Sequence, residues 1–131
     1  MSAVQVLVAD DDADLCALVA EVLGRAGYTV ATAADGAAAL AATGRMRPDL
    51  LVLDVAMPGL DGVQVCTRVK AEAATAGTRV LLISSDDSDE VIRAGSAAGA
   101  EDFLIKPFSN RELQQRVSAL LAPCSPAPTE A

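Results

Sequence analysis

Carboxylate side chains follow two hydrophobic stretches of this chain. Asp10 and Asp11 come directly after the apolar run of residues 4–9, and Asp54 follows the apolar run of residues 50–53. Carboxylates that meet at one place repel one another unless a cation joins them. Oxygen ligands of this kind suit Mg²⁺, which keeps several of its waters and accepts a phosphate oxygen. The three residues are therefore candidate ligands of a divalent cation.

Two further polar side chains stand at the ends of predicted strands. Ser84 ends the run of residues 79–84, and Lys106 follows the run of residues 102–105. A nucleophilic carboxylate, a cation, a lysine and a hydroxyl together supply a positioned nucleophile and charge neutralisation around phosphoryl oxygens. The set therefore points to phosphoryl transfer.

Each of these residues also has a simpler structural interpretation. The acidic residues 10–12 can cap the next helix, and Asp54 can belong to a turn. Lys106 with Pro107 can be an ordinary loop, and Ser84 an ordinary loop hydroxyl. Four such residues at four strand ends are hard to obtain by chance, which favours the functional interpretation.

Hydrophobic periodicity predicts five strands that alternate with five helices. The predicted strands are residues 4–9, 28–33, 49–53, 79–84 and 102–105. The first helix has its apolar stripe at Leu15, Leu18, Val19, Val22 and Leu23 and ends at Gly24 and Gly27. The other helices are residues 37–43, from the cap Asp61 to about residue 73, from Ser88 or Asp89 to Gly99, and from Ser109 to Leu121, the last with a Ser109–Glu112 capping box.

This alternation predicts an α/β fold, a doubly wound five-stranded parallel sheet with helices on both faces and the flavodoxin-like strand order 2-1-3-4-5. In that order the first and third strands are neighbours, so Asp10, Asp11 and Asp54 meet at one edge. We expect one domain over residues 1–121. The Pro-rich residues 122–131 are expected to be a linker or a frayed end.

Composition excludes several classes of function. The chain has 131 residues, a formal charge of −8 and no histidine, which disfavours nucleic-acid or membrane binding and excludes a Ser-His-Asp triad or a His-ligated zinc site. Cys16, Cys66 and Cys124 show no metal-type pairing and indicate a reduced, cytoplasmic compartment. We see no signal peptide and no apolar run near the ~20 residues of a membrane-spanning helix.

Together these motifs resemble the receiver domain of bacterial two-component response regulators, of which chemotaxis receivers are an example. The resemblance rests on the acidic pair after the first strand, the segment 53–62 around Asp54, Ser84, and the segment 102–108. It covers residues 4–121.

The resemblance implies a role for each site residue. Asp54 would accept a phosphoryl group from a histidine kinase or a histidine phosphotransfer protein. Asp11 would bind Mg²⁺, which Mn²⁺ can replace, together with Asp54 and the backbone carbonyl of Ala56, and Asp10 would act through a metal-bound water. Lys106 and Ser84 would contact the phosphoryl oxygens. Such a receiver is a signalling domain that assists its own phosphorylation and dephosphorylation, and not a separate enzyme.

The resemblance also implies a switch and an output surface. Phe103, in place of the family's frequent Tyr, would be the rotating aromatic behind Ser84. Two less common residues, Ala56 and Asp86, would alter the lifetime of the phosphoryl group. Arg93, Asp102 and Arg116 resemble the charges through which some receivers dimerise on the fourth helix, fifth strand and fifth helix, and a solvated charged face is the alternative. The signal would pass to an effector domain or an output protein.

Three other classes of protein were considered. The acidic residues 10–12 contain the D-x-D of haloacid-dehalogenase-type phosphatases, in which the first Asp is the nucleophile, but that family needs a larger chain. A flavodoxin-like cofactor binder needs a phosphate-cradling loop and aromatic residues, and only 2% of this chain is aromatic. A degenerate receiver that only binds proteins would lack phosphorylation residues that this chain has.

Overall fold

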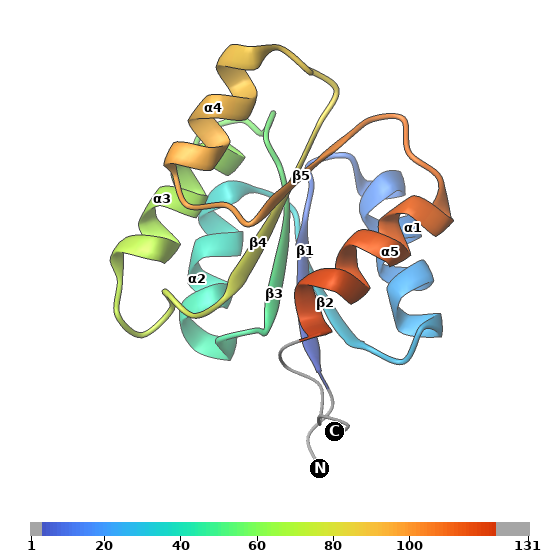
Figure 1. Cartoon of the computed structure of the whole chain (residues 1–131). Coiled ribbons are helices and arrows are strands. Elements are labelled where there is room, and N and C mark those ends of the chain that lie inside the picture. Colours follow the sequence, from blue (N-terminus) through green and yellow to red (C-terminus); the bar gives the residue numbers. More distant parts are fainter. Residues whose placement is uncertain (1–3, 123–131) are drawn as a thin grey trace, which may run out of the picture.

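The computed structural model describes residues 4–122, which form a five-stranded parallel sheet with helices on both faces (Figure 1). The strand order is β2-β1-β3-β4-β5, which confirms the predicted order. The strands are β1 (Gln5–Ala9), β2 (Thr29–Ala33), β3 (Leu50–Asp54), β4 (Arg79–Ser84) and β5 (Asp102–Ile105). The helices are α1 (Ala13–Arg25), α2 (Gly36–Met46), α3 (Gly62–Ala71), α4 (Asp89–Ala97) and α5 (Asn110–Leu121).

The bounds of the elements differ little from those predicted. Strand ends agree to within one residue, and β3 includes Asp54 as its last residue instead of stopping before it. α2 extends beyond the predicted residues 37–43 at both ends, and at its start Asp35 caps it by accepting a bond from the N–H of Ala38. α3 ends at Ala71, two residues earlier than predicted.

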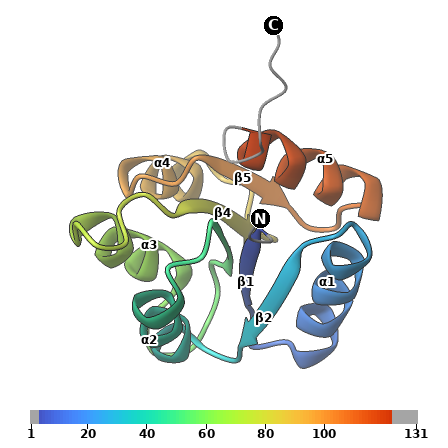
Figure 2. The same cartoon turned by 90° about the horizontal axis from the view of Figure 1, so that it is seen from below.

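The side chains of the strands alternate between two apolar layers. Val6, Val8 and the other residues of one set face α1 and α5, whereas Leu7, Leu51 and the other set face α2 and α3. Figure 2 shows α1 and α5 on one side of the sheet and α2, α3 and α4 on the other. The central strands are covered on both faces. Each therefore has a continuous apolar sequence instead of alternating apolar and polar residues.

The predicted core of α1 is wrong at Leu18. It was expected on the buried stripe, but it is 48% exposed. It lines a hollow of about 240 Å³ with Leu15, Pro107 and Phe108, where α5 and the segment before it do not close onto α1. Spacing alone identified the apolar stripe but could not show which part of it a neighbour covers.

The prediction of a complete capping box at the start of α5 is also wrong. The N–H of Glu112 donates to Ser109 Oγ at 3.0 Å, but in residues 4–122 the exposed Glu112 carboxylate makes no return bond to Ser109. A complete capping box begins α3 instead. There the N–H of Gln64 donates to Asp61 Oδ1 and the N–H of Asp61 donates to Gln64 Oε1.

α4 is the least covered helix of the described chain. Gly95 is its one buried residue, and a Cβ atom there would lie 2.8 Å from Leu82 Cδ1 and 3.3 Å from the ring of Phe103. The glycine therefore lets this helix approach the sheet. The apolar residues Val91 and Ile92, whose pattern predicted the helix, remain at least partly exposed.

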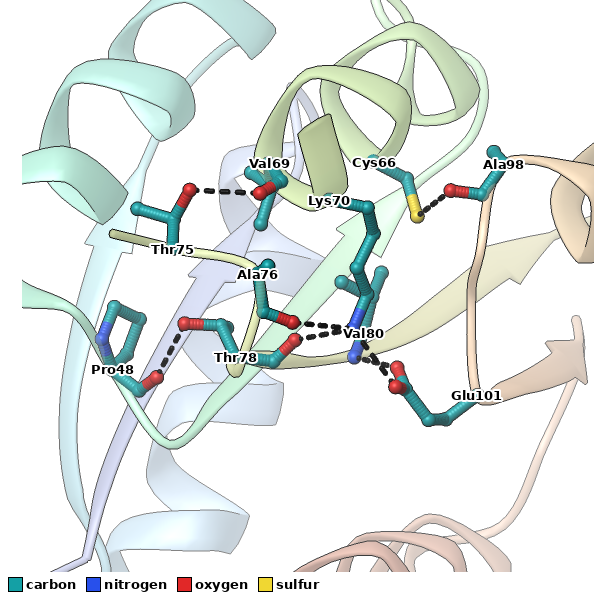
Figure 3. Close-up of polar contacts among 10 residues, drawn as sticks. All are labelled: Pro48, Cys66, Val69, Lys70, Thr75, Ala76, Thr78, Val80, Ala98 and Glu101. Atoms are coloured by element: carbon teal, nitrogen blue, oxygen red, sulfur yellow. Dashed lines mark hydrogen bonds and ion pairs between the residues drawn. The ribbon is translucent and has the colours of Figure 1, made fainter. Parts of the chain in front are cut away.

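A polar cluster lies at the edge of the sheet opposite the carboxylates (Figure 3). Lys70 Nζ from α3 donates to the Thr78 carbonyl at 2.7 Å and lies 2.8 Å from Glu101 Oε2. Glu101 Oε1 in turn accepts the N–H of Val80 at 2.7 Å. We call Lys70, Glu101 and these backbone partners the clasp, because it joins α3, the start of β4 and the segment between α4 and β5.

Two sequence predictions fall outside the described chain in whole or part. Cys124 and residues 123–131 of the Pro-rich segment lie beyond it, and α5 ends at Leu121. In residues 4–122 no helix has the length and apolar character needed to cross a membrane.

Candidate functional site

Asp54 and Asp10 are the two buried carboxylates at the carboxyl edge of the sheet. β1 and β3 pair in parallel, with Ala9 opposite Leu53, so the residues that follow these partners emerge side by side. Asp10 and Asp54 are each 5% exposed. The buried apolar strands beneath them fix their backbones, and the strand order alone brings together residues that are 44 positions apart.

The acidic residues 10–12 divide into different roles. Asp12 caps α1, because its Oδ1 accepts the N–H groups of Asp14 and Leu15. Asp10 instead faces the site, and Asp11 is exposed at its rim. Side-chain oxygens of Asp10, Asp11 and Asp54 lie within 4.8 Å of one another. The capping interpretation is thus confirmed for Asp12, and the site interpretation stays a prediction for Asp10 and Asp11.

Lys106 provides the positive charge of the site. Its Nζ lies 3.4 Å from Asp54 Oδ1 and 3.7 Å from Asp10 Oδ2. A single ammonium group at these distances cannot neutralise two buried carboxylates and a third at the rim. Burial, followed by repulsion from Asp10, raises the pKa of Asp54 to about 6, although Lys106 opposes the rise.

The remaining negative charge fits a bound divalent cation. Asp10, Asp11 and Asp54 offer carboxylate oxygens only, the ligand type that Mg²⁺ prefers over soft metals. Burial of two of the three makes their mutual repulsion costly without such a cation. The residues present therefore suit a magnesium ion chemically.

Ser84 joins the site to the segment before α4. Its Oγ is buried at the end of β4 and accepts the N–H of Asp86 at 2.9 Å. The exposed carboxylate of Asp86 accepts the N–H of Ser88, a bond that lowers the pKa of this carboxyl group. Asp86, predicted only as an extra charge near the site, thus shapes the start of α4.

The loop of residues 55–61 leads from Asp54 to α3 and contains Ala56. Its first residue, Val55, donates to the carbonyl of Ile83 at 2.8 Å and accepts bonds from the N–H groups of Met57 and Gly62. A Cβ on Gly62 would lie 2.9 Å from Val55 Cα and 3.0 Å from the carbonyl carbon of Asp54. The sequence alone did not indicate this role of Gly62, because a glycine needed for close approach looks like any other turn glycine.

Phe103, the aromatic residue of the predicted switch, and the predicted output residues lie away from the carboxylates, unlike Ser84. Phe103 packs in the layer of α2 and α3, beside Gly95 of α4. Asp102 and Arg116, predicted at a dimer face, form an ion pair with each other at 3.0 Å within the same chain, and Arg93 is exposed on α4. Phe103 and these three charges therefore lie outside the cluster formed by Asp10, Asp54 and Lys106.

Comparison with known sequences identifies the chain's relatives. Residues 6–118 match the response regulator receiver domain. The chain is 48% identical over 117 residues to the transcriptional regulatory protein PrrA of Mycobacterium tuberculosis, covering 89% of this chain and 49% of PrrA. It is 39% identical over 117 residues to the alkaline phosphatase synthesis transcriptional regulatory protein PhoP of Bacillus subtilis, covering 89% and 48%. The chain thus spans about half of each relative.

A solved structure agrees with these sequence relatives. The chemotaxis protein CheY4 of Vibrio cholerae superposes with a TM-score of 0.87 at 33% identity, covering 92% of this chain and all of CheY4. A fold shared over nearly the whole described chain agrees with the matched sequence range.

Proposed function

Because this chain belongs to the response regulator receiver family, we propose that Asp54 is the residue that accepts the phosphoryl group. The observation that carries the proposal is the position of its carboxylate. It is buried at the edge where β1 and β3 meet, 3.4 Å from Lys106 Nζ and beside Asp10. A carboxylate with a pKa near 6 is more basic than an exposed one and still largely ionised at neutral pH. It is therefore a suitable nucleophile.

In the proposed reaction an Asp54 oxygen attacks the phosphorus of a phosphohistidine. A P–O bond forms, the P–N bond breaks, and the imidazole leaves with the electron pair. Lys106 compensates the charge on the transferred group, and the Ser84 hydroxyl donates a bond to one of its oxygens. These contacts position the group and neutralise its charge, which is most of what phosphoryl transfer requires.

Asp11, Asp54 and the Ala56 carbonyl are the proposed direct ligands of Mg²⁺, with Asp10 acting through a water. When bound, the cation supplies charge neutralisation for the carboxylates and the phosphoryl oxygens. Mn²⁺ is expected to substitute. Ala56 and Asp86 are the proposed modulators of phosphoryl lifetime, since Ala56 offers no polar side chain to an attacking water.

The proposed phosphodonor is a histidine kinase or a histidine phosphotransfer protein. The hollow that contains Leu18, Phe108 and Lys106 supports this, because it places an exposed apolar surface directly beside the site. A helix that carries the donor histidine could bury that surface while its imidazole reaches Asp54.

The proposed output surface is formed by α4, β5 and α5. Gly95 is the one buried residue of α4, and a hollow of about 170 Å³ lies between Ile92 and Phe103. Ser84 and Phe103 are the proposed switch. An effector domain or output protein, or a second receiver contacting Arg93, Asp102 and Arg116, would read the change. We propose residues 1–121 as the receiver and 122–131 as a Pro-rich tail or linker.

The test is phosphorylation by a small acyl phosphate with and without Mg²⁺, read by mass spectrometry and peptide mapping. Wild type should be modified at Asp54 only with Mg²⁺, and Asp54→Asn should not be modified. Asp87→Asn is the control, because Asp87 is an exposed carboxylate outside the site. Modification at Asp10, as in a haloacid-dehalogenase-type phosphatase, would refute the assignment.

A further inference from the structure

Gly36, the first residue of α2, packs against the backbone of Leu60 in the loop of residues 55–61. A Cβ on Gly36 would lie 2.8 Å from Leu60 Cβ and 2.9 Å from the carbonyl carbon of Leu60, and closer still to its carbonyl oxygen. Real Cβ atoms do not approach other atoms so closely, so an alanine at position 36 must displace Leu60. Gly36 itself is buried.

The backbone conformation of Gly36 does not require glycine. The described glycines with positive φ are Gly27, Gly59 and Gly99, and Gly36 is not among them. At the first position of a helix capped by Asp35, most residues would stabilise the helix better than glycine. The reason for glycine here is therefore the approach of Leu60, and not a turn.

The loop that Gly36 contacts carries residues of the site. It begins directly after Asp54 and includes Ala56, whose carbonyl is a proposed metal ligand. At the far end of the loop, Gly62 holds the backbone against Asp54 and Val55, as described above. At Leu60 the same loop meets the first residue of α2.

We propose that Gly36 is a positioning residue for the metal site, acting through Leu60 on the loop that carries the Ala56 carbonyl. The proposal rests on the metal site proposed above and adds a residue that touches neither the cation nor the phosphoryl group. A contact this close means that any larger residue at position 36 forces the loop and α2 apart, and so changes where the carbonyl can lie. Displacing Leu60 then moves a ligand without removing one.

The experiment is calorimetric titration of Mg²⁺ into Gly36→Ala, wild type and Gly44→Ala. Gly44 is the matched control, because it lies in the same helix and a Cβ there meets no atom within 4 Å. Loss of an outer residue that supports a metal ligand typically weakens binding about tenfold or more. We expect Gly36→Ala to raise the Kd for Mg²⁺ about tenfold and Gly44→Ala to leave it unchanged.

A purely structural role is separated by a second measurement on the same proteins. Urea unfolding without Mg²⁺ reports stability alone, and the titrations are made where circular dichroism shows each variant folded. A folded Gly36→Ala that binds Mg²⁺ as wild type does would overturn the proposal, whatever its stability. If wild type itself binds no Mg²⁺, the metal site proposed under the function above is wrong.

A second variant covers the case in which Gly36→Ala does not fold. Leu60→Gly removes the side-chain part of the same contact, the Leu60 Cβ, keeps the part made by the Leu60 backbone, and introduces no clash. We expect it to weaken Mg²⁺ binding in the same direction. Unchanged binding in folded Leu60→Gly would then overturn the proposal.

Discussion

Replacing Asp54 with Asn should stabilise the protein in the absence of metal at neutral pH. The wild-type carboxylate is buried beside Asp10, and Lys106 at 3.4 Å compensates this only in part. Burial and the Asp10 charge raise the pKa of Asp54 from 3.8 to about 6. Asn has nearly the same shape but no charge, so it removes the repulsion and leaves the packing intact.

The pKa shift gives both the size and the pH dependence of this effect. Below about pH 4 the carboxyl group is protonated in both the folded and the unfolded states and costs nothing. Between about pH 4 and pH 6 the unfolded chain loses this proton first, so the stability of wild type falls as pH rises. Two pKa units correspond to about 3 kcal/mol, which we take as an upper bound. We expect a gain of about 1–3 kcal/mol for Asp54→Asn at neutral pH.

The assay is urea unfolding followed by circular dichroism, in a chelating buffer, over a pH series for wild type and Asp54→Asn. The difference in unfolding free energy should be small near pH 4 and reach its full value above about pH 6. Asp87→Asn removes an exposed carboxylate and should give no such pH-dependent difference. A variant no more stable than wild type at neutral pH, or equally stabilised at both ends of the series, would refute the reasoning.

Added Mg²⁺ should reduce or reverse the difference in stability between the two proteins. A ligand at 100 times its Kd stabilises the folded state by about 2.7 kcal/mol. Wild type should gain about this much, whereas Asp54→Asn lacks one proposed ligand and should gain less. The two unfolding curves should therefore approach or cross as Mg²⁺ is added.

Three other predictions concern residues outside the site. Glu101→Ala removes the carboxylate that accepts the Val80 N–H and pairs with Lys70, which keeps its bond to the Thr78 carbonyl, and should cost about 1–3 kcal/mol in urea unfolding. Glu21→Ala, which breaks the exposed pair with Arg25, should cost less than about 1 kcal/mol. Burial raises the pKa of the Cys66 thiol to about 11, so iodoacetamide should alkylate it only after unfolding, and stability should fall as pH rises from about 9 to about 11. Leu18→Ser should change stability by less than about 1 kcal/mol, while Val19→Ala, at a buried position in the same helix, should cost more than that.

The sheet and the meeting of the carboxylates could be predicted because each depends on local signals and one topological rule. Residues 50–53 form an apolar run that only a strand covered on both faces explains. Once five such runs alternate with helices, the order 2-1-3-4-5 places Asp10 and Asp54 at one edge without any knowledge of their distance. The sequence was therefore enough to predict where the residues at the strand ends lie.

Contacts between distant segments could not be predicted in the same way. Leu18 and Val19 are adjacent and both apolar, yet only Val19 is covered, because the position of α5 decides which one is buried. Glu101 finds Lys70 and Val80 across 31 and 21 residues, and no pattern near Glu101 indicates either partner. Gly36 is similar, since its close contact with Leu60 exists only after the start of α2 meets the loop of residues 55–61.

The two ends of α4 are held by different kinds of bond, and this decides where the proposed switch can act. At its C-terminal end, Glu101 joins the sheet through its backbone N–H to Val80 and through the clasp. At its N-terminal end, Asp86 N–H donates to Ser84 Oγ, the same atom that is proposed to bond the phosphoryl group. If Ser84 turns toward that group, Asp86 must follow it or lose its acceptor, while the clasp is untouched. Movement should therefore begin at residues 84–88 and diminish toward Glu101, with α4 turning about its clasped end.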